Sequence, residues 1–581
     1  MPTPLRQPQY IGVLLCAAVL AACAPPTPSP APAASAVTGA DGAWPLFGRA
    51  RVAEAPSTMV ASASPIASAV GRDVLRAGGN AIDAAVAVGF ALAVVHPEAG
   101  NLGGGGFMLI RTHAGGTHFL DYRETAPSGA TRDMYLDARG QPTERSVTGH
   151  LAAGVPGSVA GLVEAQRRFG RLPLARVIEP AIRLADSGFT VDEHRSRSIA
   201  SDRDRLARFP ASAAVFLPGG EAPRPGSVLV QRDLGRTLAA IRDRGAAGFY
   251  EGPVADLIVA EMQRGGGLIT HEDLKRYRAI WRNPIVARYH GWTLYSAAPA
   301  SAGGVVLAEL LNIAAGFPEA PFGSTALLHR EAEAMRRAYL DRNRFLGDPD
   351  FVSLPLERLL SRAYADSLRA TIGPTATRTA AVVETGPRGA STTHYSVVDA
   401  EGNAVSCTTT LNDSYGSAVT VTGAGFLLND EMDDFATAPG KPNLYGLVQG
   451  EANAIEPGKR MLSSMTPTIA LDPKGQIALV VGTPGGARIT TMVYHVVTNV
   501  IDHRMPLRLA VEAPRAHHQG WPDSLQVEAH GFRPATLDSL RALGHAILER
   551  GPWGDVQAIA RTPRGWIGVS DPRGGGAPVG D

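Results

Sequence analysis

Residues 392–412 read TTHYSVVDAEGNAVSCTTTLN, and this stretch decides the fold. Two runs of small, polar and β-branched residues flank the turn DAEGN, a pattern typical of a β-hairpin. Closing the turn pairs Val398 with Ala404, and antiparallel register then continues along both strands. This register places Thr392 opposite Thr410 at the open end of the hairpin. Two facing hydroxyls indicate either a Thr-rich strand pair with solvated side chains or a catalytic pair, and spacing alone leaves both open.

The same stretch, continued through Gly416, resembles the signature of γ-glutamyltranspeptidases, which are N-terminal-nucleophile hydrolases. The similarity runs from about residue 55 to residue 573. It implies an α/β chain of layered helices and sheets, arranged as a four-layer αββα sandwich. It also implies a precursor that cuts itself between Ser391 and Thr392.

The implied cut divides the exported chain into two subunits that stay together as a heterodimer. Residues 55–391 would form the large subunit, and residues 392–581 would form the small catalytic subunit. The new N-terminal residue, Thr392, would be the nucleophile. The resemblance gives Thr410 the role of holding the hydroxyl or the amine of that nucleophile.

An N-terminal threonine has a chemical reason to be catalytic. A Thr hydroxyl is a weak nucleophile that needs a base, and a free α-amino group, with a pKa of roughly 7.7–8.0, supplies one on the same residue. His394 suggests a triad instead, but no G-x-S-x-G elbow accompanies it. We therefore expect a structural role for His394 and a place in the apolar core for Cys407.

A γ-glutamyl group carries an α-carboxylate, for which the sequence offers a basic residue and two hydroxyls. Arg123 lies in LDYRETAP, and Ser463 and Ser464 lie in LSSMTP. On residue type alone, Arg123 would be a surface cation and the serines a turn or helix cap. The resemblance implies that all three bind the α-carboxylate, for which the planar fork of Arg is well matched.

The α-ammonium group needs an acidic partner, and residues 429–435 read NDEMDDF after an apolar run at 426–428 that we expect to be a strand. Such acids would ordinarily form a solvated loop, but at a pocket rim they attract an ammonium group. The resemblance selects Glu431 and Asp434, together with Asn412, as the α-amino ligands. Some relatives carry Gln where this chain has Glu431.

The glycine turn GTPGG, residues 482–486, is the candidate oxyanion hole. It follows an apolar strand expected over residues 477–481 and precedes a helix expected from Ile489. Backbone N–H groups at a strand-to-helix turn point outward, toward a developing negative charge. We expect Gly485 and Gly486 to bind the substrate carbonyl and to stabilise the oxyanion. The resemblance also supports a Pro/Gly-rich lid over residues 439–445, with Tyr445 at the rim.

Composition excludes some classes of function. The 581 residues are 45% hydrophobic and 19% charged with a formal net charge of +1, and no Lys/Arg run argues for nucleic-acid binding. No metal or organic cofactor is expected. Helices are expected over residues 66–75 and 81–95. The glycines at 101–106 lack the context of a phosphate or dinucleotide loop, so we expect them to allow close backbone packing.

The N-terminus has the pattern of a bacterial lipoprotein signal. Arg6 precedes the apolar run 11–22, which is too short to span a bilayer as a mature helix, and the sequence LAAC ends at Cys23. Residues 1–23 are therefore expected to be a signal peptide that ends at a lipidated Cys23, followed by a Pro/Ala-rich tether over residues 24–54. The protein would be exported and membrane-anchored, facing the periplasm. An ordinary secretory signal cut nearby is the alternative.

The leading interpretation is an autoprocessing γ-glutamyl hydrolase/transferase. Thr392 would attack the γ-amide of glutathione or a related compound, and water or an acceptor amino acid or peptide would resolve the acyl-enzyme. An acylase of the same superfamily, acting on a β-lactam side chain or poly-γ-glutamate, would not need Arg123 together with Glu431 and Asp434. A non-catalytic, lipid-anchored solute-binding protein would not need the nucleophile.

Overall fold

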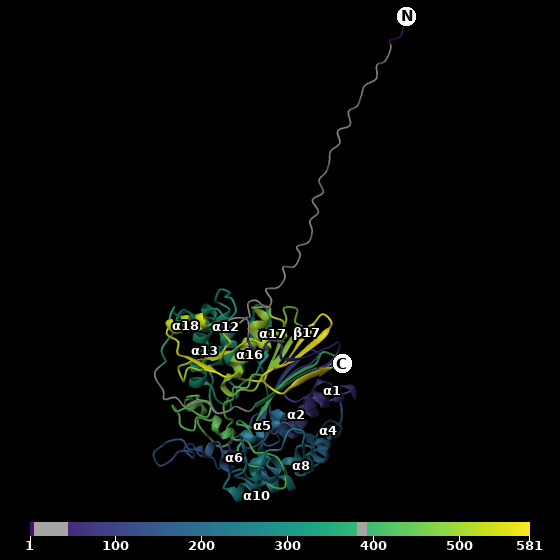
Figure 1. Cartoon of the computed structure of the whole chain (residues 1–581), viewed down its shortest axis with the longest axis vertical. Helices are drawn as coiled ribbons and strands as arrows, with labels where there is room; N and C mark the ends of the chain where they lie inside the picture. Colours follow the sequence, from purple (N-terminus) through teal and green to yellow (C-terminus); the bar gives the residue numbers. More distant parts are fainter. Residues whose placement is uncertain (5–43, 380–391) are drawn as a thin grey trace.

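A computed structural model describes residues 1–4, 44–379 and 392–581 (Figure 1). The predicted lipidation site, Cys23, and most of the predicted tether lie outside the described residues, and so does Ser391, on the far side of the predicted cut. Among the helices that are described, none is long and apolar enough to cross a membrane.

Two seven-stranded sheets form the centre of the molecule, and every strand pair in them is antiparallel. The first, here called the hairpin sheet, has the order β19 (Ala577–Gly580), β2 (Met59–Ser62), β10 (Thr392–Val398), β11 (Ala404–Thr410), β3 (Gly105–Arg111), β4 (Thr117–Tyr122), β7 (Ile280–Arg282). The second, here called the opposite sheet, has the order β1 (Arg51–Ala55), β18 (Gly565–Ser570), β17 (Gln557–Thr562), β13 (Ile477–Gly482), β12 (Thr468–Leu471), β9 (Trp292–Ser296), β8 (Ile285–Tyr289).

The two sheets pack face to face, and helices cover their outer faces (Figure 1). Apolar side chains from both sheets, such as Leu109 and Val480, fill the space between them. The four-layer αββα sandwich is therefore confirmed. Helices α1 (Pro65–Arg76), α2 (Ala81–Val95) and α3 (Ser158–Phe169) pack on the hairpin sheet. Outside them, α4 (Leu174–Ser187) packs on α2, and α8 (Arg232–Arg244) packs on α4. Helices α12 (Gly303–Ala314), α16 (Ile489–Ile501) and α17 (Leu507–Glu512) pack on the opposite sheet, and α13 (Thr325–Phe345) packs on the outside of α12.

Smaller elements surround this sandwich. The other α-helices are α5 (Glu193–Ser201), α6 (Arg203–Leu206), α7 (Pro210–Phe216), α9 (Ala247–Tyr250), α10 (Pro253–Gly265), α11 (His271–Arg276), α14 (Leu356–Leu359), α15 (Arg362–Ala370) and α18 (Pro534–Ala542). Two small sheets join β5 (Phe189–Thr190) to β6 (Val228–Leu229), and β14 (Ala516–His517) to β15 (Leu525–Glu528) and β16 (Ile547–Arg550).

The predicted hairpin forms with the predicted register. Val398 pairs with Ala404 and Thr392 pairs with Thr410, and all residues of both strands are buried. The side chain of Asp399 closes the turn by accepting hydrogen bonds from the backbone N–H of Asn403 (2.9 Å) and of Ala81 at the start of α2 (2.9 Å). One carboxylate thus fixes both the turn and the helix that packs on the sheet.

Helix α2 forms as predicted and is buried along its whole length. Asn80 caps it, because its side chain accepts from the backbone N–H of Ile82 and Asp83 while Asp83 bonds back to the N–H of Asn80. A cap of this kind contributes about 1 kcal/mol. The glycines before β3 are confirmed as a close-packing device, because a Cβ on Gly104 would lie 2.1 Å from the carbonyl oxygen of Thr410.

One expected strand is wrong. Residues 426–428 are buried as expected, but they make only isolated bridges, from Leu427 to Thr420 and from Leu428 to Gly103. The backbone just before them turns through a positive φ of 77° at Gly425, and residues 431–434 form a 3₁₀ turn just after them. The segment is therefore too short between these two bends to build a ladder.

Candidate active site

The open end of the hairpin holds the two facing threonines. The Oγ1 atoms of Thr392 and Thr410 are 3.2 Å apart, and Oγ1 of Thr410 also accepts a hydrogen bond from the N–H of Asn412 (2.8 Å). Asn412 has a φ of 82°, a conformation that Asn tolerates better than most residues. The N–H of Asn412 thus orients the hydroxyl of Thr410, which in turn lies against the hydroxyl of Thr392.

The two threonines line a small pocket whose walls come from both sides of the predicted cut. Its volume is about 20 Å³, room for roughly one water molecule, so the pocket is closed around its own side chains. The lining consists of Arg123, Arg342, Thr392, Thr410, Asn412, Glu431, Asp434, Tyr445, Leu447, Ser463, Ser464, Met465, Gly486, Ala487 and Ile489. The structure therefore brings together every predicted site residue except Gly485, which is next to the lining residue Gly486.

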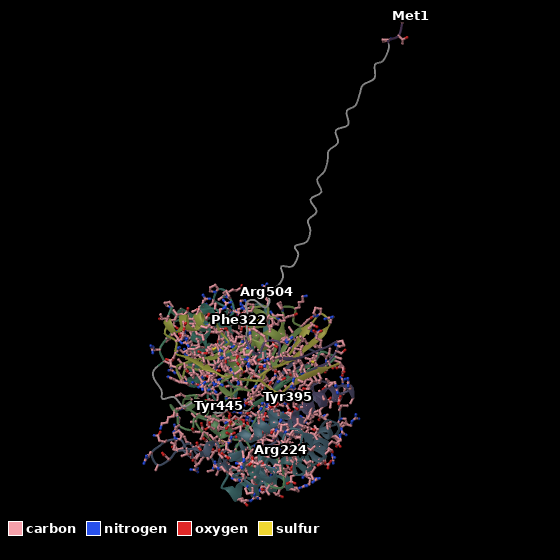
Figure 2. All side chains as sticks on the ribbon, viewed as in Figure 1. Met1, Arg224, Phe322, Tyr395, Tyr445 and Arg504 are labelled. Carbon is pink, nitrogen blue, oxygen red and sulfur yellow. The ribbon has the colours of Figure 1, made fainter. Side chains whose placement is uncertain are left out.

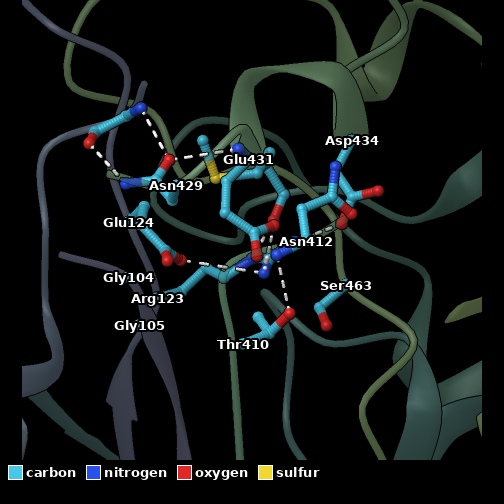
Figure 3. Close-up of polar contacts among 12 residues, drawn as sticks. Gly104, Gly105, Arg123, Glu124, Thr410, Asn412, Asn429, Glu431, Asp434 and Ser463 are labelled. Atoms are coloured by element: carbon cyan, nitrogen blue, oxygen red, sulfur yellow. Dashed lines mark hydrogen bonds and ion pairs between the residues drawn. The ribbon is translucent and has the colours of Figure 1, made fainter. Parts of the chain in front are cut away.

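Arg123 occupies the middle of a buried ion-pair cluster (Figure 3). It follows directly on the end of β4, and its Nη1 lies 2.6 Å from Oε2 of Glu431 and 3.7 Å from Oε2 of Glu124. Its Nη2 donates to Oδ2 of Asp434, and its Nε donates to the carbonyl oxygen of Met461 (3.2 Å). The predicted carboxylate ligand and the predicted ammonium ligands are thus paired with one another in the closed pocket.

The acids of this cluster outnumber the cation that they share. Burial raises the pKa of Glu431 well above its ordinary value, against the pull of Arg123, and the neighbouring carboxyls of Glu124 and Asp434 raise it further. Burial likewise raises the pKa of Glu124 to about 8. Burial would lower the pKa of Arg123, but the surrounding carboxyls reverse this, so the guanidinium stays charged. The cluster therefore holds at least one proton at neutral pH.

The acidic pair does not sit at a pocket rim, as the sequence suggested. Glu431 is fully buried and Asp434 is 9% exposed, because the 3₁₀ turn of residues 431–434 folds inward over Arg123. Only a charged partner makes such burial tolerable, since an isolated buried carboxylate is very costly.

Arg342 is a pocket residue that the sequence reasoning missed. It is 2% exposed on α13, and its Nη2 donates to Oγ of Ser464 (3.1 Å). Burial lowers the pKa of Arg342 to about 10, which leaves it charged at neutral pH. Its position on the helix carried a signal, because Leu328, Met335 and Tyr339 precede it at helical spacing and are buried. An arginine in phase with an apolar stripe points inward.

The serine pair lies beside this arginine. Oγ of Ser463 accepts a hydrogen bond from the N–H of Met465 (3.1 Å), a local turn contact of the kind that serine favours. Both serines line the pocket, and together with Arg123 and Arg342 they form its donor-rich side.

The glycine turn follows β13 and ends in a 3₁₀ turn, residues 486–488, that leads into α16. Gly485 has a φ of 140° and Gly486 a φ of 56°, values that favour glycine. Neither N–H donates a hydrogen bond to any acceptor in the described chain. Two unengaged N–H groups at the start of a helix can receive a developing oxyanion.

Tyr445 covers the pocket from the predicted lid. Its hydroxyl donates to Oδ1 of Asn412 (2.6 Å), and a Cβ on Gly486 would lie 2.8 Å from its ring. The tyrosine is 7% exposed, so it lies over the site rather than at an open rim.

His394 and Cys407 have the structural places expected of them. Nδ1 of His394 lies 2.8 Å from Oγ1 of Thr408, and burial lowers the pKa of His394 to about 3. Sγ of Cys407 lies 3.0 Å from the hydroxyl of Tyr122, and burial raises the pKa of the thiol to about 12. Neither residue lines the pocket.

Comparison with known proteins identifies the family. The family model for gamma-glutamyltranspeptidase matches residues 67–580. A glutathione hydrolase proenzyme of Escherichia coli K12 is 44% identical over 98% of each chain, and one of Pseudomonas sp. A14 is 47% identical over 90% of this chain and 91% of its own. The crystal structure of a cephalosporin acylase from Bacillus halodurans superposes with a TM-score of 0.82 at 30% identity, covering 93% of this chain and 98% of that one. Residues 67–580, and with them the whole candidate site, belong to the gamma-glutamyltranspeptidase family.

Proposed function

We propose that this family member is an autoprocessing γ-glutamyl hydrolase/transferase that cleaves the γ-glutamyl amide of glutathione and related compounds. One observation carries the proposal. A guanidinium with two carboxyls, complementary to the two charges of an α-amino acid, lies in the same pocket as Thr392 and Thr410. The high identity to glutathione hydrolase proenzymes supports the same reaction.

Processing comes first. A cut between Ser391 and Thr392 gives a large subunit that ends at residue 391 and a small subunit that begins with Thr392. The freed α-amino group then becomes the general base for the hydroxyl of the same residue. Thr410, 3.2 Å from that hydroxyl, orients it for attack.

As the substrate binds, Arg123 and the two acids exchange their ion pair with one another for ion pairs with the substrate. Its α-carboxylate takes Arg123 from Glu431 and Asp434, with Ser463, Ser464 and Arg342 adding donors. Its α-ammonium then restores a cation to those acids, with Asn412 as a further acceptor. Every buried charge keeps a partner, so a free amino acid end binds well and a group lacking either charge does not.

The chemical step transfers the γ-acyl group to Thr392. Its Oγ1 attacks the γ-carbonyl carbon while the α-amino group takes the hydroxyl proton, and the carbonyl oxygen becomes negative beside the N–H groups of Gly485 and Gly486. As the C–N bond breaks, the proton passes to the leaving amine, Cys-Gly in the case of glutathione. Water or an acceptor amino acid then attacks the ester by the same steps in reverse. One oxyanion donor of this type is worth roughly 10²–10³ in rate.

An acylase for β-lactam side chains or poly-γ-glutamate is the second candidate. The structural match to a cephalosporin acylase at 30% identity favours it, and so does an acylase proenzyme of Pseudomonas sp. SE83 that is 40% identical over 90% of this chain. The glutathione hydrolases are more similar, at 44–47% identity. A glutaryl or similar side chain has no α-ammonium to pair with Glu431 and Asp434. A non-catalytic solute-binding protein would gain support only from a chain that stays uncut.

The deciding experiment is N-terminal sequencing of the purified protein together with hydrolysis of γ-glutamyl-p-nitroanilide. We expect a second N-terminus at Thr392 and release of p-nitroaniline. Glutaryl-p-nitroanilide, which lacks the α-ammonium, is the matched control substrate and should react far more slowly. A faster glutaryl reaction would replace the proposed function with the acylase.

We also propose that Cys23 carries a lipid and anchors the enzyme to a membrane, facing the periplasm. The LAAC sequence supports this. Wild-type protein should fractionate with membranes, and replacing residues 1–23 by an ordinary signal peptide should release active, soluble enzyme. Soluble wild-type protein with an N-terminus beyond Cys23 would overturn the anchor and leave the catalytic proposal intact.

A further inference from the structure

A second and much larger cavity lies away from the catalytic pocket. Its volume is about 900 Å³, within the range of small-molecule sites, and it is bounded by the start of α13, the end of α16 and the β8–β9 turn. Phe322 and Arg504 mark this region in Figure 2, well apart from Tyr445 in the catalytic pocket. None of the proposed catalytic residues lines it.

Glu331 is a buried acid in the wall of this cavity that lacks a charged partner among the described residues. It lies on α13, lines the cavity and is 8% exposed. Its carboxylate accepts no hydrogen bond from any described residue, and its one ion-pair contact is Nε2 of His495 at 3.8 Å. Burial lowers the pKa of His495 to about 3, so this imidazole is neutral and cannot balance a carboxylate.

A second acid faces the same space. Asp502, at the end of α16, accepts a hydrogen bond from the hydroxyl of Tyr289 through Oδ2 (2.7 Å), but its buried Oδ1 has no donor in the described chain. Its nearest basic group is Nε2 of His290, at 3.8 Å. The cavity wall therefore holds one buried acid, Glu331, and one half-buried acid, Asp502. No described residue gives either of them a charge-balancing contact of the kind that Arg123 supplies in the catalytic pocket.

Other charged residues also line this cavity. Nη1 of Arg330 donates to the carbonyl oxygen of Pro318 (2.9 Å), and its guanidinium lies over the ring of Phe317, so it is engaged with the loop before α13. The other titratable groups that line the cavity are Glu319, His503 and Arg504, on the loops that flank α13 and α16.

The rest of the wall is apolar and aromatic, with Trp292, Phe322 and Tyr494 among its residues. The described residues contain no group of three or more His, Cys, Asp or Glu side chains that could hold a metal ion. The carboxylates therefore suit an organic cation better than a bare ion, and aromatic faces attract ammonium groups as well.

We propose that this cavity is a binding site for a small organic cation, a primary ammonium carried on an apolar or aromatic body. The ammonium pairs with the carboxylates of Glu331 and Asp502, and the body packs against Trp292 and Tyr494. The site is independent of the proposed function and requires no catalytic residue.

Binding at this site is linked to a proton. Burial, and then the charge of Asp502, raises the pKa of Glu331 to about 8, so at pH 7 an arriving ammonium displaces a proton from Glu331. Affinity should therefore rise with pH until Glu331 is ionised, by up to tenfold for each pH unit below its pKa.

The test is calorimetric titration of the processed enzyme with phenethylamine at pH 6.5 and pH 9.0, with 2-phenylethanol as the uncharged analogue. We expect at least tenfold tighter binding of the amine at pH 9.0 and no comparable gain for the alcohol. Glu331→Gln should abolish this gain and weaken binding at pH 9.0 at least tenfold. Glu193→Gln, at an exposed acid on α5, is the matched control and should bind as the wild type does.

Three results would overturn the proposal: unchanged binding in Glu331→Gln, equal binding of the alcohol, or competitive inhibition of γ-glutamyl-p-nitroanilide hydrolysis that persists in Glu331→Gln. The last would place the amine in the catalytic pocket. If Glu331→Gln does not fold, Asp502→Asn takes its place and should weaken binding at pH 9.0. Unchanged binding in that variant also overturns the proposal.

Discussion

Acids line two pockets of the protein, and their surroundings differ in the two pockets. In the catalytic pocket Glu431 and Asp434 close directly onto Arg123, which leaves about 20 Å³. In the second cavity no described Lys or Arg forms an ion pair with Glu331 or Asp502, and about 900 Å³ stays open beside them. A buried carboxyl needs a cation or a proton. In the catalytic pocket the chain itself supplies the cation, and the pocket is closed. In the second cavity it does not, and there is room for a cation from solution.

The largest expected effect tests whether the two regions are independent. Thr392→Ala should leave one uncut, inactive chain, because both processing and acyl transfer use this hydroxyl. Phenethylamine binding in the second cavity should be retained. Electrophoresis, the p-nitroanilide assay and calorimetry measure the three properties.

Thr393→Val is the control for this variant, since Oγ1 of Thr393 is buried and has no hydrogen-bond partner among the described residues. It should process normally. A Thr392→Ala chain that still splits at the same bond would show that Thr392 is not the processing nucleophile.

The next largest effect is expected from a substitution that removes the ion pairs of Arg123 in the catalytic pocket. Arg123→Ala removes the cation from Glu431 and Asp434, and truncating one member of a buried charged pair costs on the order of 2–5 kcal/mol. We expect kcat/KM for γ-glutamyl-p-nitroanilide to fall at least about thirtyfold. Self-cleavage needs no substrate and should largely survive.

Arg123→Lys should rescue only part of the loss, because Lys has the charge without the bidentate fork. Unchanged kcat and KM in Arg123→Ala would remove this residue from the substrate site.

The third prediction uses stability to expose the unpaired acid. The pKa of Glu331 is about 8 in the folded protein, against roughly 4.3 for an unfolded Glu, so the folded state holds the proton more tightly. Its contribution to stability is complete below about pH 4.3 and is lost as pH rises through 8. Glu331→Gln should remove this loss and gain on the order of a few kcal/mol relative to wild type between pH 5 and pH 9.

Thermal unfolding at the two pH values measures this difference. The neighbouring titratable groups Asp502, His290 and His503 contribute to both proteins, so the comparison between variants isolates Glu331. Glu193→Gln should follow the wild type. A Glu331→Gln protein whose midpoint falls with pH as steeply as the wild type would show that Glu331 is not held protonated.

The smallest effect concerns Arg342, which donates a hydrogen bond to Ser464 and forms no ion pair with a described acid. Arg342→Lys should keep the charge and lose the reach to Oγ of Ser464. We expect KM to rise several-fold, because the loss of one hydrogen bond weakens substrate binding by about 1 kcal/mol. Both kcat and processing should be nearly unchanged. A fall in kcat at constant KM would mean that Arg342 acts on the reacting atoms instead.

The parts of this molecule that the sequence predicted are those that depend on local order. Alternation around a five-residue turn sets the register that brings Thr392 to Thr410, and a strand followed by glycines and a helix places Gly486. Such local structure can be predicted from the sequence, because the alternation of side chains along a strand and the residue preferences of turns depend on only a few neighbouring residues.

The parts that were not predicted depend on contacts between distant segments. The ion pair of Arg123 with Glu431 joins residues more than 300 positions apart in the sequence. No periodic pattern in the sequence predicts such a contact. The second cavity needs α13, α16 and a β-turn at once, so Glu331 looked like one helical acid among many. Arg342 lies between these cases, because its helical phase was visible but its contact with Ser464 was not.

The strand order has a consequence for a chain cut at the proposed bond before Thr392, with residues up to 391 as the large subunit and the rest as the small subunit. In the hairpin sheet, β10 from the small subunit lies between β2 from the large subunit and β11, and β19 lies on the other side of β2. In the opposite sheet, large-subunit strands occupy both edges around a small-subunit middle. A nick before Thr392 therefore divides the chain without dividing the fold. Pulling the subunits apart would dismantle both sheets, so we expect mature enzyme molecules not to exchange subunits while they remain folded.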